Sequence, residues 1–319
     1  MKTSTVLGIV LAVLFSFAGV ATAAGYLWAR ADDDHPTVTR ALPAVWPTKD
    51  GKALRPVPMP AGELVVALPP DTAGQVLCQS LGQDRWEALL GGKALREVRG
   101  ASCHVVTANT DVTLALTDSP ANLQDPHDIE VSGRAARLEY LPPYVNTRLD
   151  TQLADRPGSD QIKPFLRVEL SGSAPALDQL TESVAAEVVA ATTKPGPALP
   201  AAGKDGSIPV EHPAPAAITD LPWPMISWQL CAALTRELGG TPRPYSDGRC
   251  TVRGIQAAYT DSVSPRVFPD RLAGRPALIT DSLVAVKLSD DTSQELAFTG
   301  TGHSLKALAE SVVPRLLAG

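Results

Sequence analysis

The sequence LCQSL at residues 77–81 decides the fold, because a close copy of it, LCAAL, follows at residues 230–234. After each copy comes a second cysteine that opens a predicted strand, in CHVV at residues 103–106 and in CTVR at residues 250–253. Short motifs that recur in the same order are typical of an internal repeat. The sequence therefore predicts a tandem duplication.

The correspondence continues to the end of both copies. GRAA at residues 133–136 matches GRPA at residues 274–277, each after a turn and before an apolar run. We expect the next strand at residues 165–170 in the first copy and 283–288 in the second, where apolar and polar side chains alternate. A closing helix with one apolar stripe then ends each copy, through Leu177, Leu180, Val184 and Val188 and through Leu305, Leu308, Val312 and Leu316.

This order of elements predicts an α+β fold. Each copy reads as an opening helix, several strands and a closing helix, without the alternation of strand and helix that builds a parallel sheet. We therefore expect two tandem related domains, each a mainly antiparallel sheet packed by helices. A single N-terminal transmembrane helix is expected to precede them.

Composition limits the possible functions. The chain has 319 residues, of which 44% are hydrophobic and 19% charged, which is enough apolar material for two cores. The formal net charge is -6, and the chain has no run of Lys or Arg with interleaved aromatic residues. Nucleic-acid binding is therefore not expected.

The N-terminal segment predicts export. Residues 6–29 contain no charged side chain. This segment is long enough for a helix that crosses a membrane. Lys2 precedes this segment and an acidic run at residues 32–34 follows it, so the positive-inside rule places the rest of the chain outside the cytoplasm. The alternative is a signal peptide cleaved after the A-x-A motif at residues 21–23. Apolar character that continues to Trp28 favours the uncleaved anchor, and both interpretations export the protein.

Two proline-rich stretches mark the predicted domain boundaries, because proline favours extended backbone. The expected organisation is a membrane anchor or signal peptide at 1–30, a stalk at 31–62, a first domain at 63–193, a linker at 194–221 and a second domain at 222–319. A short strand at residues 63–68 is expected to begin the first domain.

These features together resemble the DUF3558 family of actinobacterial cell-envelope proteins. The resemblance rests on the leucine–cysteine helix, the second cysteine at a strand start, the Gly-x-x-Ala element and the closing helix, behind an export segment and a stalk. It implies an envelope location and the fold, and no biochemical activity. The chain departs from the family because its first cysteine is Cys78, so no lipid-attachment cysteine lies near the export segment. A further cysteine that such domains often carry is also missing from both copies.

The four cysteines are predicted to form two disulfides. They allow three connectivities, and only Cys78 with Cys103 and Cys231 with Cys250 repeats identically in both copies. Each bond would attach an opening helix to the edge of its sheet. Loops of this length should stabilise each domain by about 3 kcal/mol in the chain-entropy model.

No motif identifies a catalytic, cofactor-binding or metal site. The cysteines form no C-x-x-C pair, and the five histidines, His35, His104, His127, His212 and His303, are scattered. The glycine-rich segment at residues 300–304 lacks the Lys-Ser/Thr ending of a phosphate loop, so Ser304 is interpreted as a helix cap.

We therefore expect a membrane-tethered, extracytoplasmic, non-catalytic module for binding, sensing or envelope scaffolding. Its partner would be an unknown envelope protein or small ligand. The alternative is an exported enzyme, such as a hydrolase whose Ser, His and Asp are dispersed in the sequence. A histidine within hydrogen-bond reach of Ser or Cys, with a carboxylate behind it, would indicate the enzyme.

Overall fold

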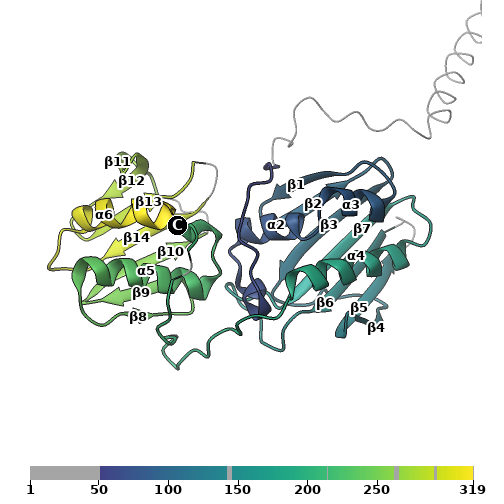
Figure 1. Ribbon diagram of the computed structural model, residues 1–319, viewed down its shortest axis with the longest axis horizontal. Helices are drawn as coiled ribbons and strands as arrows, with labels where there is room; N and C mark the ends of the chain where they lie inside the picture. The colour runs from purple at the N-terminus through teal and green to yellow at the C-terminus, as the bar shows by residue number, and fades with distance from the viewer. Residues whose placement is uncertain (1–50, 142–145, 214, 262–265, 291–292, 319) are drawn as a thin grey trace, which may run out of the picture. The chain divides into compact units, whose positions relative to one another are not determined.

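Two antiparallel sheets, each with seven strands among the described residues, carry the fold in the computed structural model (Figure 1). The structure describes residues 51–141, 146–213, 215–261, 266–290 and 293–318. The α+β architecture of two similar sheet domains is therefore confirmed. Residues 6–29, predicted to anchor the chain, lie outside the described residues. Within the described part, none of the helices has the length and apolar character needed to cross a membrane.

The strands of the first sheet lie in the order β1-β2-β3-β7-β6-β5-β4, and every neighbouring pair is antiparallel. Strands β3 and β7 form its centre, with Leu114 opposite Val168. The strands are β1 (Leu95–Arg99), β2 (Ser102–Val106), β3 (Thr110–Thr117), β4 (His127–Val131), β5 (Arg134–Leu141), β6 (Asn146–Gln152) and β7 (Phe165–Gly172).

The second sheet repeats this topology, in the order β8-β9-β10-β14-β13-β12-β11. Position by position, β8 corresponds to β1, β9 to β2, β10 to β3 and β14 to β7. The strands are β8 (Arg243–Pro244), β9 (Arg249–Val252), β10 (Ile255–Thr260), β11 (Asp270–Leu272), β12 (Arg275–Ile279), β13 (Leu283–Lys287) and β14 (Glu295–Thr299).

One expected correspondence between the copies is wrong. Residues 165–170 belong to β7, whose counterpart is β14, whereas residues 283–288 contain β13, the counterpart of β6. The error arises because β13 and β7 both combine a run of apolar residues with one basic side chain. The turns before β5 and β12 do correspond, since Ser132-Gly133 and Ala273-Gly274 all have positive φ, between 49° and 77°. Paired left-handed residues are typical of a tight hairpin.

Helices cover one face of each sheet. In the first domain, α2 (Pro70–Gln79) packs on β1, β2 and β3, while α4 (Leu177–Thr192) packs on β6 and β7 and α3 (Gln83–Leu90) contacts α4. In the second, α5 (Trp223–Leu238) packs on β8, β9 and β10, and α6 (Leu305–Ala318) on β13 and β14. Proline in the first turn of α2 and of α5 suits a position whose N–H needs no partner. The closing helices α4 and α6 confirm the predicted apolar stripes, of which only Leu180 is partly exposed.

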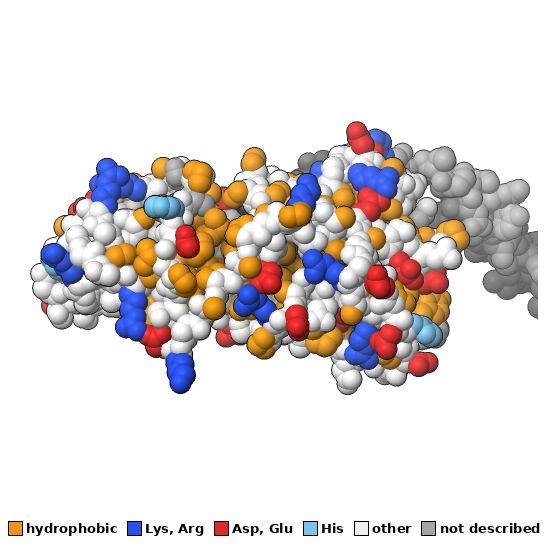
Figure 2. Space-filling model, turned by 60° about the horizontal axis from the view of Figure 1, so that its bottom comes forward, with side chains coloured by type: hydrophobic (Ala, Val, Ile, Leu, Met, Phe, Trp, Pro, Cys, Tyr) orange, Lys and Arg blue, Asp and Glu red, His pale blue; other side chains and the backbone are white. Residues whose placement is uncertain are grey.

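The opposite face of the first sheet is polar. Along β7 the buried Leu166, Val168 and Leu170 alternate with Arg167 and Glu169, as the strand period of two requires. Arg167 Nε lies 2.8 Å from Asp150 Oδ1, and Arg148 Nε lies 2.8 Å from Glu169 Oε1, so neighbouring strands carry paired charges. Figure 2 presents a different side of the molecule, the bottom of the view in Figure 1, and there too basic and acidic side chains are interspersed.

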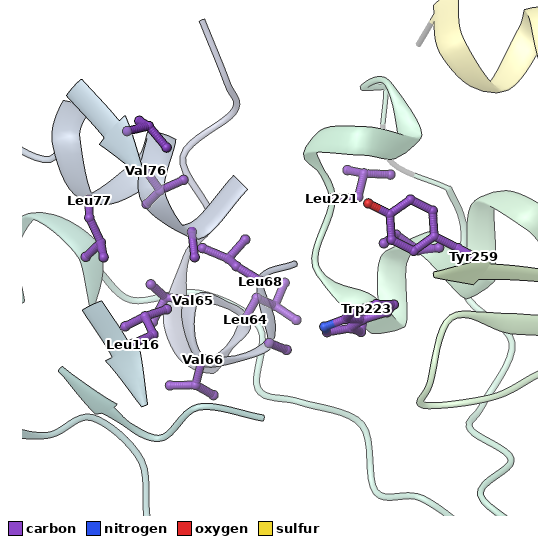
Figure 3. Close-up of a cluster of buried hydrophobic side chains, with 14 of the residues drawn as sticks. Leu64, Val65, Val66, Leu68, Val76, Leu77, Leu116, Leu221, Trp223 and Tyr259 are labelled. Carbon is purple, nitrogen blue, oxygen red and sulfur yellow. The ribbon is translucent and has the colours of Figure 1, made fainter. Parts of the chain in front are cut away.

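Residues 63–68 do not form the expected strand. They belong largely to a 3₁₀ helix, η1 (Gly62–Ala67), and five successive residues, from Leu64 to Leu68, are buried. A strand with one solvated face would bury only alternate side chains. The structure instead buries the segment in an apolar cluster that includes Val76, Leu77 and Leu116 of the first domain and Trp223 of the second (Figure 3).

The two domains form one compact unit together with the segments around them. Lys52, in the predicted stalk, pairs with Val98 of β1. The predicted linker contacts both domains, since Leu199 O accepts a hydrogen bond from Arg156 Nη2 at 3.1 Å and Pro209 O accepts one from Trp228 Nε1–H at 2.8 Å. The second short helix, η2 (Ile218–Asp220), ends the linker.

Candidate functional site

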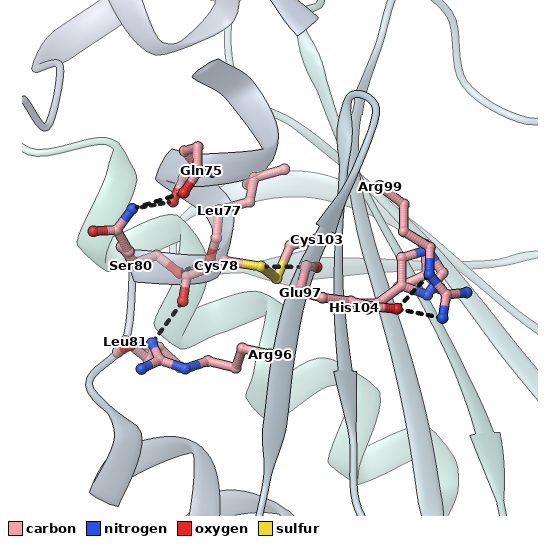
Figure 4. Close-up of a disulfide and its surroundings, with 12 residues drawn as sticks. Gln75, Leu77, Cys78, Ser80, Leu81, Arg96, Glu97, Arg99, Cys103 and His104 are labelled. Atoms are coloured by element: carbon pink, nitrogen blue, oxygen red, sulfur yellow. Dashed lines mark hydrogen bonds and ion pairs between the residues drawn. A yellow bond between two sulfur atoms is a disulfide. The ribbon is translucent and has the colours of Figure 1, made fainter. Parts of the chain in front are cut away.

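Both predicted disulfides are present. Cys78 of α2 is bonded to Cys103 of β2, with their Cα atoms 5.1 Å apart, and Cys231 of α5 is bonded to Cys250 of β9, at 5.3 Å. The duplication predicted the pairing correctly, but each bond attaches the opening helix to the strand next to the sheet edge, β2 or β9, and not to the edge strand itself. Figure 4 shows the first of the two bonds. The four side chains are at most 2% exposed. Because a buried disulfide is poorly accessible to a thiolate, these bonds are structural.

The surroundings of the first disulfide hold the end of α2. Arg96 of β1 donates from Nη1 to the carbonyl oxygens of Cys78, at 2.9 Å, and Leu81, at 3.1 Å. A cation at a helix C-terminus satisfies carbonyl groups that have no partner within the helix. Further along β1, Glu97 is paired with Arg99 (Figure 4).

The histidines do not form a catalytic arrangement in the described part of the chain. His104 Nδ1 lies 3.4 Å from Thr113 Oγ1, and burial, with Arg99 nearby, lowers the pKa of His104. His127 lines a shallow hollow of about 400 Å³. His212 and His303 are exposed, and His35 lies outside the described residues. None of the described histidines shares a hydrogen bond with a serine or cysteine side chain.

The other sequence features have structural roles. Ser304 Oγ accepts a hydrogen bond from Ala307 N–H at 3.3 Å, which makes it the cap of α6 rather than part of a phosphate loop. Among the described residues, no three His, Cys, Asp or Glu side chains are grouped so that they could hold a metal ion.

Three acidic residues meet where the two domains join. Asp71, in the first turn of α2, accepts hydrogen bonds from Lys52 Nζ at 2.7 Å and Arg55 Nη2 at 3.4 Å, and Arg55 also pairs with Asp220 of η2. The third, Asp261, follows β10 and accepts a hydrogen bond from Ser293 Oγ at 3.2 Å. This cluster links the segment before the first domain to the second domain.

Asp261 is the most perturbed carboxyl group in this cluster. Burial raises its pKa to about 6, and the charge of Asp71 adds to this effect. The hydroxyl of Ser293, the backbone N–H of Asp71 and the ammonium group of Lys52 act in the opposite direction. Asp261 Oδ2 is buried and accepts no hydrogen bond from the described residues. The nearby Tyr259 has its pKa raised well above 10 by burial.

A groove of about 400 Å³ on the second domain is the best candidate for a ligand site. Its floor is one face of α5, formed by Gln229, Ala232, Ala233 and Arg236. These residues share a face because the other three follow Gln229 by three, four and seven positions in the helix. The two alanines leave room above the helix because their side chains are short. The end of the linker and α6 form its walls, through Pro213, Pro215, Arg315 and Leu316.

Two polar groups of this groove lack a hydrogen-bond partner among the described residues. Gln229 is only 8% exposed, and its Nε2 donates to Ala216 O at 2.9 Å, but its buried Oε1 accepts no hydrogen bond. A buried acceptor without a partner costs about 1–3 kcal/mol. Arg236 is exposed and forms no hydrogen bond or ion pair with a described residue. By contrast, Arg315 pairs with Glu237 and donates to Ser311 Oγ at 3.1 Å.

The chain matches no protein-family model, no curated protein and no solved structure. The resemblance to the DUF3558 family therefore stays a prediction. Sequence reasoning missed the groove, although the spacing Q-x-x-A-A-x-x-R was visible at residues 229–236. That pattern alone could not be distinguished from any solvated helix face.

Proposed function

We propose that this protein is an extracytoplasmic binding module held to a membrane by residues 6–29. The observation that carries the proposal is the buried disulfide in each of the two similar domains. Such bonds form and persist in oxidising compartments outside the cytoplasm. The uncharged segment at residues 6–29 supplies a means of export and a membrane anchor.

Binding is supported by the groove on the second domain. Small-ligand sites are concave and mostly apolar, with a few polar groups that fix the orientation of the ligand. The groove has this composition, with alanine, proline and leucine side chains around Gln229 and Arg236. The resemblance to DUF3558 proteins is a separate argument, and it supports an envelope location.

Added protease tests this topology in intact cells whose wall has been removed. We expect the protease to digest both domains and to leave a short membrane-embedded stub, while a cytoplasmic marker protein stays intact. Protection of both domains until the cells are lysed would contradict the proposed orientation. A mature N-terminus at Ala24 would replace the anchor by a cleaved signal peptide.

A further inference from the structure

We propose that β4 is a docking edge, at which an extended segment of another protein with alternating basic and apolar residues adds to the first sheet as one more antiparallel strand. This surface is separate from the groove on α5 and goes beyond the binding function proposed above. Three features of β4 carry the inference, which are its open backbone groups, the apolar hollow beside it and the charge of its outer side chains.

The edge formed by β4 is uncovered, unlike the opposite edge of the same sheet. There Lys52 pairs with Val98 of β1, and in the second sheet Ser207 pairs with Tyr245 beside β8. Along β4, the only backbone pairing with a described residue is the ladder to β5 (Figure 1). β4 has five residues, whereas the other uncovered edge strand, β11, has three. An exposed edge of this length is a template for an added strand.

The open backbone groups of β4 belong to its two acidic residues. The tight turn at Ser132-Gly133 makes Val131 of β4 and its partner in β5 the closing pair of the hairpin. Hydrogen-bonded pairs recur at every second residue from there, so the N–H and C=O groups of Asp128 and Glu130 point away from β5. Both residues are exposed, and an incoming strand therefore reaches these groups directly.

The helix side of β4 borders an apolar hollow. α4 contacts the strand, and at one end Ser132 Oγ donates a hydrogen bond to Ala186 O at 3.2 Å. At the other end lies the hollow of about 400 Å³, whose lining includes His127, Leu177 and Tyr140, the last of which is 50% exposed. Side chains of an added strand alternate between the two faces. A residue opposite His127 therefore projects to the helix side, where the hollow accommodates an apolar side chain.

The outer side of β4 favours basic partner residues. Asp128 is 91% exposed, with its Oδ1 3.8 Å from Arg137 Nε, and Glu130 is exposed and forms no ion pair with a described residue. Lysine or arginine directly opposite these two carboxylates stabilises a pair of strands. A second copy of β4 fits poorly, because pairing the open backbone groups of two copies places acidic residues opposite each other. The edge is thus complementary to a foreign basic strand.

Calorimetric titration of the purified full-length protein with acetyl-Val-Lys-Val-Lys-Leu-amide tests the proposal. In the antiparallel register, the two lysines lie opposite Glu130 and Asp128, and the leucine lies opposite His127. We expect saturable binding, and at least tenfold weaker binding when both lysine backbone nitrogens are methylated, because methylation removes the donors of the added ladder and keeps the charges. Methylation of the two valine nitrogens is the control, since those N–H groups point away from β4. Glutamate in place of both lysines should weaken binding at least tenfold.

Variants of β4 test the same edge from the protein's side. Glu130→Pro removes an N–H that has no acceptor in β5, so the variant should fold and bind the lysine peptide at least tenfold more weakly. Glu130→Lys should weaken binding of the lysine peptide and strengthen binding of the glutamate peptide. Asp281→Lys reverses an exposed charge in the second domain and should change neither.

Several results would overturn the inference. Full affinity after methylation of the lysine nitrogens, or in Glu130→Pro, would show that the charges attract the peptide without an added strand. A lysine peptide that does not bind at millimolar concentration would show that this edge is closed to partners. Sedimentation of the protein as a dimer that Glu130→Pro dissociates would assign the edge to a second copy instead.

Discussion

Replacing Asp261 by asparagine should remove a pH dependence of stability. The pKa of Asp261 is about 6 in the folded protein, against an ordinary value of about 3.9. A difference of about two pH units, at about 1.36 kcal/mol per unit, corresponds to about 3 kcal/mol. Because the folded state binds the proton more tightly, this contribution is complete below about pH 4 and is lost as the pH rises to about 6.

The groups around Asp261 determine how much of this energy is observed. Asp71 opposes ionisation of Asp261, while Lys52 and the Ser293 hydroxyl favour it. Asparagine keeps the shape of the side chain and one acceptor oxygen for Ser293, so the substitution removes mainly the charge. The Asp261→Asn variant should therefore gain stability relative to the wild type as the pH rises, by up to about 3 kcal/mol.

Urea unfolding of the wild type and Asp261→Asn at pH 4.5, 5.5, 6.5 and 7.5 measures the effect. The difference in the free energy of unfolding should grow between pH 4.5 and 6.5 and then stay constant, because titratable groups far from residue 261 contribute equally to both proteins. Asp128→Asn is the control, because the Asp128 side chain is 91% exposed. The difference in the free energy of unfolding between this variant and the wild type should not change with pH. A constant difference for Asp261→Asn would show that this carboxyl group is not buried at the junction.

Three further predictions concern the stability of the domains. Cys231→Ala with Cys250→Ala opens a link between residues 19 apart and should lower the free energy of unfolding by about 3 kcal/mol; an unchanged urea midpoint would refute a stabilising role. Phe298→Ala, at a side chain with no exposed surface, should cost about 3–5 kcal/mol, whereas Val267→Ala, at 78% exposure, should stay within about 0.5 kcal/mol. Residues 203–319, expressed in an oxidising compartment, should unfold cooperatively by circular dichroism, because they include the linker contacts of Ile208 with Pro244 and of Gln229 with Ala216. A molten fragment would show that the two domains depend on a shared core.

The repeated cysteines and the helical stripes were the predictable part of the fold. LCQSL and LCAAL place a cysteine on the buried face of each opening helix, and the second cysteine follows 25 residues later in the first copy and 19 in the second. The closing helices were equally clear because Leu, Val and Ala recur at three- and four-residue steps. Such local periodicities can be recognised without knowledge of what the elements pack against.

The remaining features depend on contacts between distant parts of the chain. The equivalence of β13 with β6 follows only from sheet order, because its apolar sequence resembles β7 more closely. Residues 63–68 have the composition of a strand, but most of them are buried whichever way they point, and they coil into η1. Asp261 and Gln229 are ordinary in sequence, and only their burial without a full set of partners distinguishes them.

Peptide mapping of the native protein tests the central claim most directly. Cells would be quenched in acid, free thiols alkylated, and the protein digested without reduction for mass spectrometry. The account of an exported protein with one disulfide in each domain predicts linked peptides joining Cys78 to Cys103 and Cys231 to Cys250, with no alkylated cysteine. Alkylated cysteines in the folded protein, or a link from Cys78 to either cysteine of the second domain, would contradict it.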